Sequence, residues 1–364
     1  MKAMVSDMTR VCLDDVAREI KQKASAGQEL PTVGLEHLDP GEVELARWDE
    51  SAETTFTKAF SKGQVLFGRR RAYLRKAAVA PFDGICSGDI TVIAAKSSLS
   101  PRLLPFIIQN DALFEHAVTN SAGSLSPRVK WQSLSQFEFE LPSDDRQEEL
   151  ADILWAAQEA KSHYKQLLKT CDDIVKSQFV EMFGHAESGE FSTLRECCMT
   201  IQGGKTPSMK HPEYYGGGIP FIKSGDVKQD IVSKGALSLT ERALTDAGVK
   251  LVPNDSVLVV TRNAMLHNKM YSALSACRLA INQDVKAFIP LPDYLSSYLL
   301  WAIRVHEQEL LAGTRSVSTC ALDFEQLCSI EVQKAPIQRQ EAFASFVSQV
   351  DKSKFRLGTC DATP

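Results

Sequence analysis

Positive charge is concentrated in one stretch of the chain that contains no acid. Between Glu53 and Asp83 there are seven lysines and arginines, three of them consecutive, and no aspartate or glutamate. Arginine side chains neutralise phosphates and present planar forks that fit guanine edges, so this stretch predicts contact with nucleic acid. The alternative is a charged surface that only faces solvent. The candidate contact residues are Arg69, Arg70, Arg71, Tyr73, Arg75 and Lys76.

A second acid-free stretch runs from Ser256 to Gln283 and combines cations with amides, which can pair with adenine. Two further segments, 123–130 and 313–316, offer small residues and cations that let a phosphate approach the backbone closely. Because the same chemistry recurs in both halves, we favour nucleic-acid binding over a solvated surface. The candidates in these segments are Ser124, Ser126, Arg128, Lys130, Arg262, Asn263, His267, Lys269, Asn282, Gln283 and Arg315.

No recognisable catalytic or metal-binding motif accompanies these candidates. The chain has no Pro-Pro dipeptide, which the active-site loop of an amine-directed DNA methyltransferase needs. The segment 203–206 lacks the first glycine of a phosphate-binding loop, because Met199 stands there. The seven histidines have no metal-ligand spacing, and the nine cysteines form no C-x-x-C pair, which predicts reduced thiols and no zinc site. We therefore expect no catalytic residue and no metal site. A nuclease or transferase with an unrecognised active site and a scaffold with protein-binding domains remain the alternatives.

The composition is that of an ordinary globular protein. Of the 364 residues, 44% are hydrophobic and 24% are charged, and the formal net charge of -5 excludes a uniformly basic nucleic-acid binder. The length favours two domains. No charge-free run is long enough to span a membrane, and Asp7, Asp14 and Asp15 do not fit a signal peptide. We expect a soluble, cytoplasmic protein.

The sequence repeats itself with a long period. Four matches occur in the same order in both halves, and their offsets drift by only a few residues, as loop insertions would produce. A period this long indicates two copies of a whole domain with its tail, not a solenoid of short units. The matches are Leu13 with Leu194 at an offset of 181, 65–67 with 257–259 at 192, 89–90 with 284–285 at 195, and 146–148 with 339–341 at 193.

Each copy is expected to be a mixed α/β domain followed by a helix. Short β-rich runs separated by turn residues precede apolar helical stretches such as 103–117 and 294–311. From Arg146 to Phe183 there is no proline or glycine, and apolar residues recur at three- and four-residue steps, which predicts a helix about 57 Å long. A shorter stripe at 337–355 predicts a second helix that packs against the first, antiparallel if the copies are related by a pseudo-two-fold axis.

The helices are expected to act as spacers and to carry a partner-binding surface. We predict a first domain at 1–145, a long spacer helix at 146–184, a second domain at 187–335 and a shorter spacer helix at 336–357. A long apolar stripe on an acidic helix needs a covering surface. The candidate partner-binding residues are Leu150, Leu154, Tyr164, Leu168, Val175, Phe343 and Val347.

Several short motifs resemble those of the specificity subunits of type I restriction-modification enzymes. In the first copy these are 34–38, 69–76, 86–90 and 123–131, and in the second 204–208, 223–227 and 280–284. The strand ends and helix starts around 141–147 and 336–340 resemble the same family. Each motif is weak alone, but their order in both halves is fairly specific. The second-copy motifs add Lys205, Thr206, Lys223 and Ser224 to the candidate contact residues.

The resemblance implies an α+β fold: two duplicated mixed α/β target-recognition domains separated by long antiparallel coiled-coil helices. It implies a non-catalytic subunit in which each domain reads half of an interrupted double-stranded DNA site. It also implies that the helices dock methyltransferase subunits, that a restriction/translocase subunit can join, and that this chain binds no cofactor. S-adenosylmethionine, ATP and Mg2+ would be used by the other subunits. The second helix departs from the family by its shortness, so the helical pair is either lopsided or completed by another chain.

Overall fold

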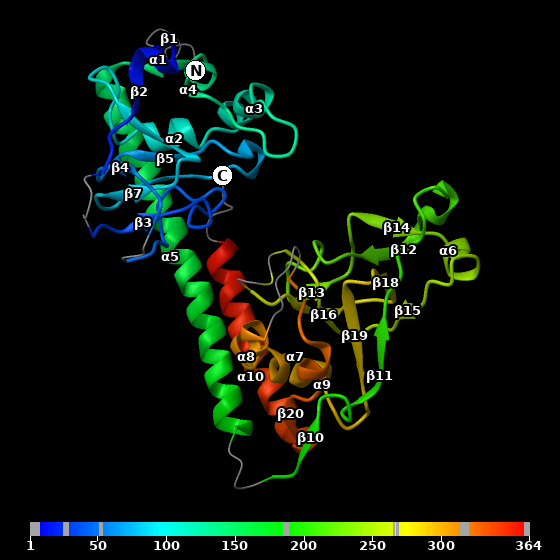
Figure 1. The fold of residues 1–364 in the computed structure, drawn as a ribbon. Coiled ribbons are helices and arrows are strands. Elements are labelled where there is room, and N and C mark those ends of the chain that lie inside the picture. The colour runs from blue at the N-terminus through cyan, green and yellow to red at the C-terminus, as the bar shows by residue number, and fades with distance from the viewer. Residues whose placement is uncertain are drawn as a thin grey trace. The chain divides into compact units, whose positions relative to one another are not determined.

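The computed structural model describes residues 8–24, 29–50, 54–184, 189–264, 266, 269–313 and 320–359. The chain divides into two compact units, residues 1–164 and 165–364, and each is described by itself (Figure 1). The division falls inside the long helix, which therefore contributes residues to both units, whereas the sequence predicts a separate spacer helix at 146–184. Among the described residues, no helix is long and apolar enough to cross a membrane.

The first unit contains two small sheets and a strand pair. The main sheet has the order β2 (Ala17–Ile20), β8 (Ile90–Ala95), β5 (Val65–Gly68), β6 (Ala77–Val79). The second sheet has the order β3 (Thr32–Val33), β7 (Gly84–Cys86), β4 (Lys58–Phe60), and β1 (Met8–Cys12) pairs with β9 (Glu138–Pro142). The short helices are α1 (Leu13–Val16), η1 (Ala72–Leu74), α2 (Leu104–Ile108), α3 (Asp111–Thr119) and α4 (Trp131–Leu134).

The second unit contains two larger sheets and an equivalent strand pair. The main sheet has the order β11 (Cys198–Gly203), β19 (Val285–Pro290), β16 (Val257–Val260), β17 (Ser272–Ser275), β13 (Ile231–Val232). The other sheet has the order β14 (Leu237–Leu239), β12 (Tyr215–Ile222), β18 (Leu279–Ile281), β15 (Leu251–Val252), and β10 (Phe191–Thr193) pairs with β20 (Glu331–Gln333). The helices are η3 (Pro212–Tyr214), α6 (Glu241–Thr245), α7 (Ser296–Val305), α8 (Glu307–Ala312), α9 (Phe324–Cys328) and α10 (Ile337–Thr359).

The two units are copies of one fold, which confirms the predicted fold class of duplicated mixed α/β domains. The strand order β2-β8-β5-β6 of the first unit recurs as β11-β19-β16-β17 in the second. Strands β5 and β16 lie 192 residues apart in the sequence, and β8 and β19 lie 195 residues apart, as the repeat indicates. The parallel pair β3 and β7 recurs as the parallel pair β12 and β18. In both units an antiparallel pair joins the first strand to the last.

The long helix α5 runs from Asp144 to Phe183, 40 residues, which corresponds to about 60 Å. It begins after Pro142 and ends at Gly184, where a Cβ atom would lie 2.6 Å from the carbonyl oxygen of Val180. Any other residue at Gly184 would therefore displace the last turn of the helix.

Within the second unit, α10 packs antiparallel against the C-terminal part of α5. The Phe179 ring lies 5.3 Å from that of Phe343 near the start of α10, and Lys354 Nζ donates to Asp172 Oδ1 at 2.7 Å near its end. Phe183 and Tyr298 complete this buried aromatic cluster. The predicted antiparallel contact between the two helical stripes is confirmed for this part of α5.

A buried glutamine joins the helix to the domain in each unit. Gln147 on α5 accepts a hydrogen bond from the backbone N–H of Ser100 at 2.8 Å and donates to the carbonyl oxygens of Ser98 and Pro142. Gln340 on α10 accepts from Leu295 N–H at 2.8 Å and donates to the carbonyls of Asp293 and Ala335 at 2.9 and 2.8 Å. The two residues occupy equivalent positions and are 2% and 0% exposed. The same polar anchor thus fixes the start of both helices.

Candidate nucleic-acid interface

In the first unit, the basic stretch forms a tight turn around η1. Arg71 and Arg75 flank this helical turn with φ angles of 54° and 52°, in the left-handed region that costs a non-glycine residue about 1–2 kcal/mol. Such backbone strain clusters at functional sites. Arg75 pairs with Asp111 at 2.5 Å. Arg71 is exposed and makes no side-chain hydrogen bond or ion pair with the described part of the chain, so its charge is available to a ligand.

The loop 121–129 is fixed against this turn by backbone hydrogen bonds. Arg71 N–H donates to the carbonyl of Pro127 at 2.8 Å, and Val129 N–H donates to that of Arg69 at 3.0 Å. Gly123 supplies a φ of 113°, which a residue with a side chain adopts rarely. Ser124 and Leu125 at the tip are exposed, and Leu125 is 90% exposed. The loop therefore presents its tip to solvent from a firm base.

One carboxylate organises the arginines at the base of this loop. Arg128 donates from Nε to Asp89 Oδ1 at 2.6 Å and from Nη2 to Oδ2 at 3.1 Å. Arg70 reaches the same carboxylate at 3.5 Å and donates to the hydroxyl of Ser126 at 3.3 Å. The hydrogen bond from Arg128 lowers the pKa of Asp89 below its usual range, so this carboxylate stays ionised at neutral pH. Asp89 is not among the contact residues predicted from the sequence, which include no acid, although the motif 86–90 contains it.

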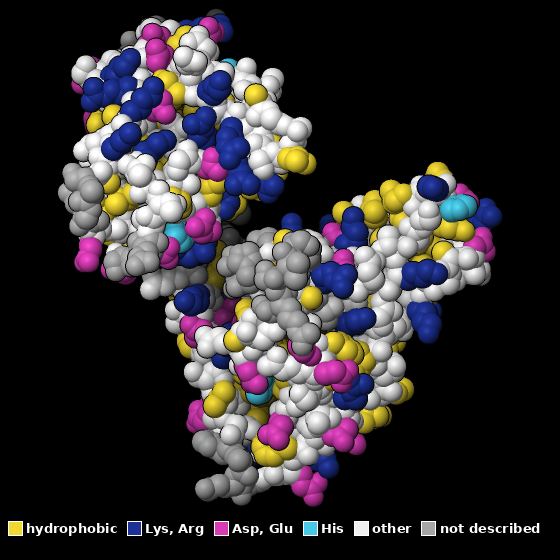
Figure 2. All heavy atoms as spheres, viewed as in Figure 1, with side chains coloured by type: hydrophobic (Ala, Val, Ile, Leu, Met, Phe, Trp, Pro, Cys, Tyr) yellow, Lys and Arg dark blue, Asp and Glu magenta, His cyan; other side chains and the backbone are white. Residues whose placement is uncertain are grey.

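The remaining cations of the stretch have different roles. Lys76 Nζ donates to the carbonyl of Leu35 at 2.7 Å, and burial lowers the pKa of this lysine. The Nε atoms of Arg69 and Arg70 are buried without a hydrogen-bond partner in the described structure. Lys130 and the side chain of Tyr73 are exposed. Figure 2 shows many Lys and Arg side chains on the visible face of this unit, with fewer acids among them.

In the second unit, the candidate residues follow the carboxyl ends of four strands that meet at one edge. The strands β12 and β18 run parallel with Ile222 opposite Ile281, so both end at the same edge. The strands β11 and β16 are both antiparallel to β19, with Gly203 opposite Lys286 and Val260 opposite Val285. The two pairs belong to different sheets, but the turn 282–284 joins the end of β18 directly to the start of β19. The loops after these strands, 204–206, 223–224, 261–263 and 282–283, therefore lie at one edge of the domain.

Gly204 permits the closest approach at this edge. A Cβ atom there would lie 2.1 Å from the carbonyl oxygen of Ile281 and 2.3 Å from that of Asn282. The N–H of Lys205 donates to the Ile281 carbonyl at 3.1 Å, and the Thr206 hydroxyl donates to Gln283 Oε1 at 2.7 Å. Lys205, Thr206 and Gln283 are exposed, so they form one polar surface.

The other candidates of the second unit differ in accessibility. Arg262 and Lys269 are exposed, and Lys269 Nζ lies 6.0 Å from the centre of the Tyr271 ring. Lys223, Ser224 and Asn263 are half-buried. Asn282 is 4% exposed and its amide donates to Asp284 Oδ2 at 2.9 Å, so it lies outside the accessible surface. His267 and Arg315 lie outside the described residues.

The equivalent edge exists in the first unit. There Gly68 at the end of β5 lies opposite Ile90 at the start of β8, and Arg69 N–H donates to the carbonyl of Asp89 at 2.9 Å. In the second unit Thr261 N–H donates in the same way to Asp284, at 2.8 Å. The cationic turn of the first unit and the polar surface of the second are thus built on the same part of the repeated fold.

The predicted partner-binding residues separate into buried and accessible ones. Val175 and Phe343 are fully buried in the core of the second unit, which leaves no surface for a partner there. Leu154, Tyr164 and Leu168 are half-buried, and Leu150 is 39% exposed. The most exposed large apolar residues of α5 within 150–174 are 14 and 7 residues apart, which are multiples of a heptad: Ile153 at 66%, Leu167 at 45% and Ile174 at 48%. This is the spacing of a coiled-coil seam.

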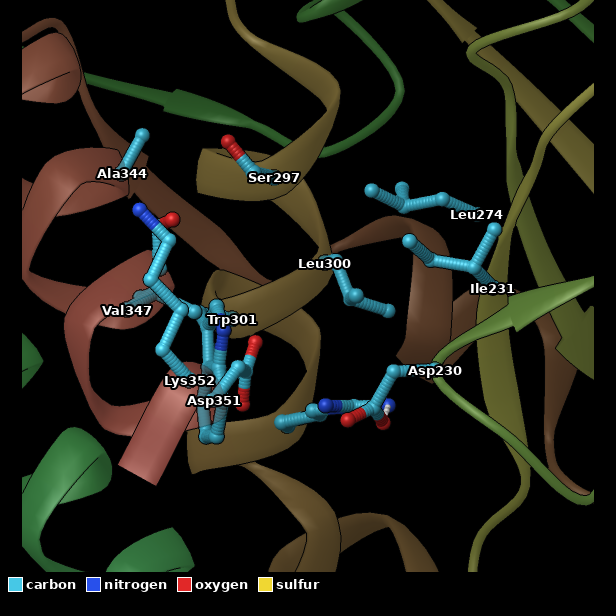
Figure 3. A pocket seen from close by; sticks show the side chains of 12 residues that line it. Asp230, Ile231, Leu274, Ser297, Leu300, Trp301, Ala344, Val347, Asp351 and Lys352 are labelled. Carbon is cyan, nitrogen blue, oxygen red and sulfur yellow. Dashed lines mark hydrogen bonds and ion pairs between the residues drawn. The ribbon is translucent and has the colours of Figure 1, made fainter. Parts of the chain in front are cut away.

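Val347 lines an apolar cavity of about 550 Å³ in the second unit. Figure 3 shows Ile231 and Leu274 on one side of this cavity and Val347 on the other, with Leu300 between them. Ile231 is 60% exposed. The accessible apolar surface of the second unit therefore includes Leu167 and Ile174 of α5 and this cavity.

The chain is similar to proteins of one family. Residues 187–359 match the family model described as the type I restriction modification DNA specificity domain. The chain is 28% identical over 152 residues to the EcoR124I/EcoR124II specificity subunit of Escherichia coli, covering 41% of this chain and 38% of that protein. It is 28% identical over 156 residues to the MjaIX specificity subunit of Methanocaldococcus jannaschii, covering 42% and 35%. The aligned regions thus span less than two fifths of these relatives.

The solved S subunit of a type I restriction-modification system from M. genitalium has a similar fold, with a TM-score of 0.50 at 11% identity, covering 99% of this chain and 93% of that one.

Proposed function

We propose that the chain is the DNA-recognition subunit of a type I restriction-modification complex, on the premise that residues 187–359 match the model of the type I restriction modification DNA specificity domain. The observation that carries the proposal is the structural repeat. The four strands of the main sheet of the first unit have the same order as four strands of the matched domain, which supports two recognition domains of one kind. Each would read one half of an interrupted double-stranded target through the edge described above.

We assign DNA-binding and partner-binding roles to residues according to their charge and exposure. Arg71, Arg128 and Lys130 would contact DNA from the first unit, and Lys205, Thr206, Gln283, Arg262 and Lys269 from the second. Phosphate contacts set affinity and orientation, whereas contacts to base edges set the sequence. The seam of α5 would bind a methyltransferase subunit, which would supply the chemistry with S-adenosylmethionine. A restriction subunit that uses ATP and Mg2+ would join through that complex.

Exchanging residues 187–335 for the equivalent domain of a related specificity subunit should change one half of the methylated target and leave the other half intact. The reason is that each unit has its own core and its own recognition edge. Sequencing the methylated sites of cells that carry the exchanged chain with its methyltransferase measures this. A continuous target, or a change in both halves, would contradict the assignment of one half-site to each unit.

Replacing Arg71 by glycine should weaken DNA binding without weakening the fold. Glycine relieves the left-handed strain of about 1–2 kcal/mol, which offsets its entropic cost of about 0.5–1 kcal/mol, so the free energy of unfolding should change by less than about 1 kcal/mol. Loss of one phosphate contact should weaken binding to every duplex and reduce the slope of log K against log salt by about one. Fluorescence anisotropy with the purified full chain at several salt concentrations measures the affinity and the salt slope.

The matched control for this prediction is Asp255→Gly. Asp255 also has a positive φ, 57°, but it precedes β16 and so lies at the opposite end of that strand from the recognition edge. Its replacement should leave the affinity and the salt slope unchanged. If Arg71→Gly also leaves both unchanged, Arg71 does not contact DNA.

A further inference from the structure

The side chain of Arg128 is held in a defined orientation. Two of its five N–H donors are used by the carboxylate of Asp89, at 2.6 and 3.1 Å. Arg128 is 43% exposed and Asp89 is 20% exposed, so the carboxylate lies on the inner side of the guanidinium group. A charged pair of this bidentate kind fixes the plane of the arginine before any ligand binds.

The outer end of the guanidinium group remains available. Nη1 makes only a long contact, 3.4 Å, with the carbonyl of Ser126, and the second hydrogen of Nη2 has no partner in the described structure. Two adjacent N–H groups of an arginine match the O6 and N7 acceptors of guanine in the major groove. The donors that Asp89 leaves unused are therefore the pair that this recognition needs.

The backbone around Arg128 is also fixed. Its N–H and carbonyl exchange two hydrogen bonds with Ala122, at 2.9 and 3.0 Å, and the next residue, Val129, donates to the Arg69 carbonyl. The segment lies beside the strained turn of Arg71, whose charge is free to contact a phosphate. A recognition side chain held on a rigid base loses little conformational entropy when it binds.

We propose that Arg128 recognises a guanine base in the half-site bound by the first unit, and that Asp89 is the positioning residue that aims it. The inference rests on the proposed function and adds to it the identity of one base. Arg70 lies 3.5 Å from Oδ2 of the same carboxylate and donates to the hydroxyl of Ser126, so it helps to hold Asp89 in place.

The second unit gives an internal comparison. The bridge between Arg70 and Arg128 recurs between Arg262 and Ala321, so alanine occupies the position of Arg128. There the carboxylate of Asp284 accepts from the Asn282 amide at 2.9 Å. The equivalent position of the second unit therefore cannot make this contact, and we expect the two halves of the target to be read by different side chains.

The test uses Arg128→Lys in the full chain, in complex with its methyltransferase. Lysine keeps the charge but has no planar fork, so it cannot pair with both oxygens of Asp89 and at the same time present two fixed donors to guanine. The dissociation constant is measured for duplexes that carry each of the four base pairs at each position of the first half-site. The wild-type chain should prefer guanine at one position by roughly 5- to 150-fold, and Arg128→Lys should reduce that preference to less than about threefold while leaving the other positions unchanged.

The substitution Asp89→Asn tests whether Asp89 positions Arg128 or only stabilises the fold. It should reduce the guanine preference at the same position only, and adding it to Arg128→Lys should cause no further loss there, because the two residues act as one unit. A merely structural role would instead lower the thermal midpoint and the affinity for every duplex. The matched control is Arg102→Lys. Arg102 is also paired with acids, Asp152 at 2.6 Å and Glu148 at 3.4 Å, but these two acids lie on α5.

Two results would overturn the inference. In one, Arg128→Lys keeps the guanine preference. In the other, it weakens binding to all duplexes equally, as a phosphate contact would. A wild-type complex without any sequence preference would instead contradict the proposed function itself, so the two failures can be told apart.

Discussion

Replacing both Ile153 and Leu167 by aspartate should abolish co-purification of the chain with its methyltransferase partner. The two side chains are 66% and 45% exposed and lie two heptads apart on α5. Burying an apolar side chain of this size contributes about 1.5–3 kcal/mol, and burying an unpaired carboxylate adds a further cost. Two such changes should weaken the complex by more than about 100-fold. Isothermal titration calorimetry with the purified subunits measures the loss.

The fold should survive these two substitutions, because both side chains already face solvent in the isolated chain. The matched control replaces Val118 and Met199, which are 42% and 65% exposed and lie outside the long helices, by aspartate. It adds the same charge and should leave the complex intact. An unimpaired complex with the helix variant would mean that the partner binds another surface.

Replacing Gln340 by alanine should destabilise the second unit by about 3–5 kcal/mol. The side chain is fully buried, and its removal leaves one backbone N–H and two backbone carbonyls without partners, each at a cost of about 1–3 kcal/mol. Gln147→Ala should act in the same way on the first unit, since it removes the equivalent anchor. Urea denaturation measures the size of the effect, and hydrogen exchange locates it in one unit.

The control for this prediction is Gln338→Ala, which removes an exposed glutamine from the same helix. Its effect should be within about 0.5 kcal/mol. A loss of less than about 1 kcal/mol for Gln340→Ala would show that water or neighbouring groups replace the three hydrogen bonds. The buried glutamine would then not be the feature that fixes the helix to the domain.

The repeat and the helices were the parts of the fold that the sequence predicted well. Both can be recognised from the order and spacing of residue types along the chain. The buried strands β5 and β16 carry the same apolar run, and the stretch from Asp144 to Phe183 contains no residue that breaks a helix. Such patterns can be read from a single sequence, because the periodicity of apolar residues reflects which face is buried.

The chemistry of the candidate site was harder to predict, because it depends on pairing between distant residues. The run Arg69 to Lys76 looked like one cationic cluster, yet Arg75 is paired with Asp111. Arg70 reaches Asp89, and Lys76 donates to a backbone carbonyl. Asn282 was a candidate for reading adenine, but a neighbouring carboxylate holds its amide inside the protein.

The predicted partner-binding stripe includes residues that the chain itself buries. Periodicity identifies an apolar face, but it does not say whether the chain itself covers that face. Val175 and Phe343 are covered by the core of the second unit, whereas Ile153 and Leu167 are not. Only the tertiary structure separates the two sets.

The pairing of first and last strands has a consequence for biosynthesis. In the first unit Met8 lies opposite Pro142, and in the second Phe191 lies opposite Gln333, so each pair joins residues that are synthesised far apart in time. Contacts of such high sequence separation close large loops and slow folding. At about 5–20 residues per second, the ribosome takes several seconds to deliver the closing strand after the opening one. During that interval β1 or β10 has an unpaired edge, which makes the nascent unit prone to aggregation and to capture by chaperones.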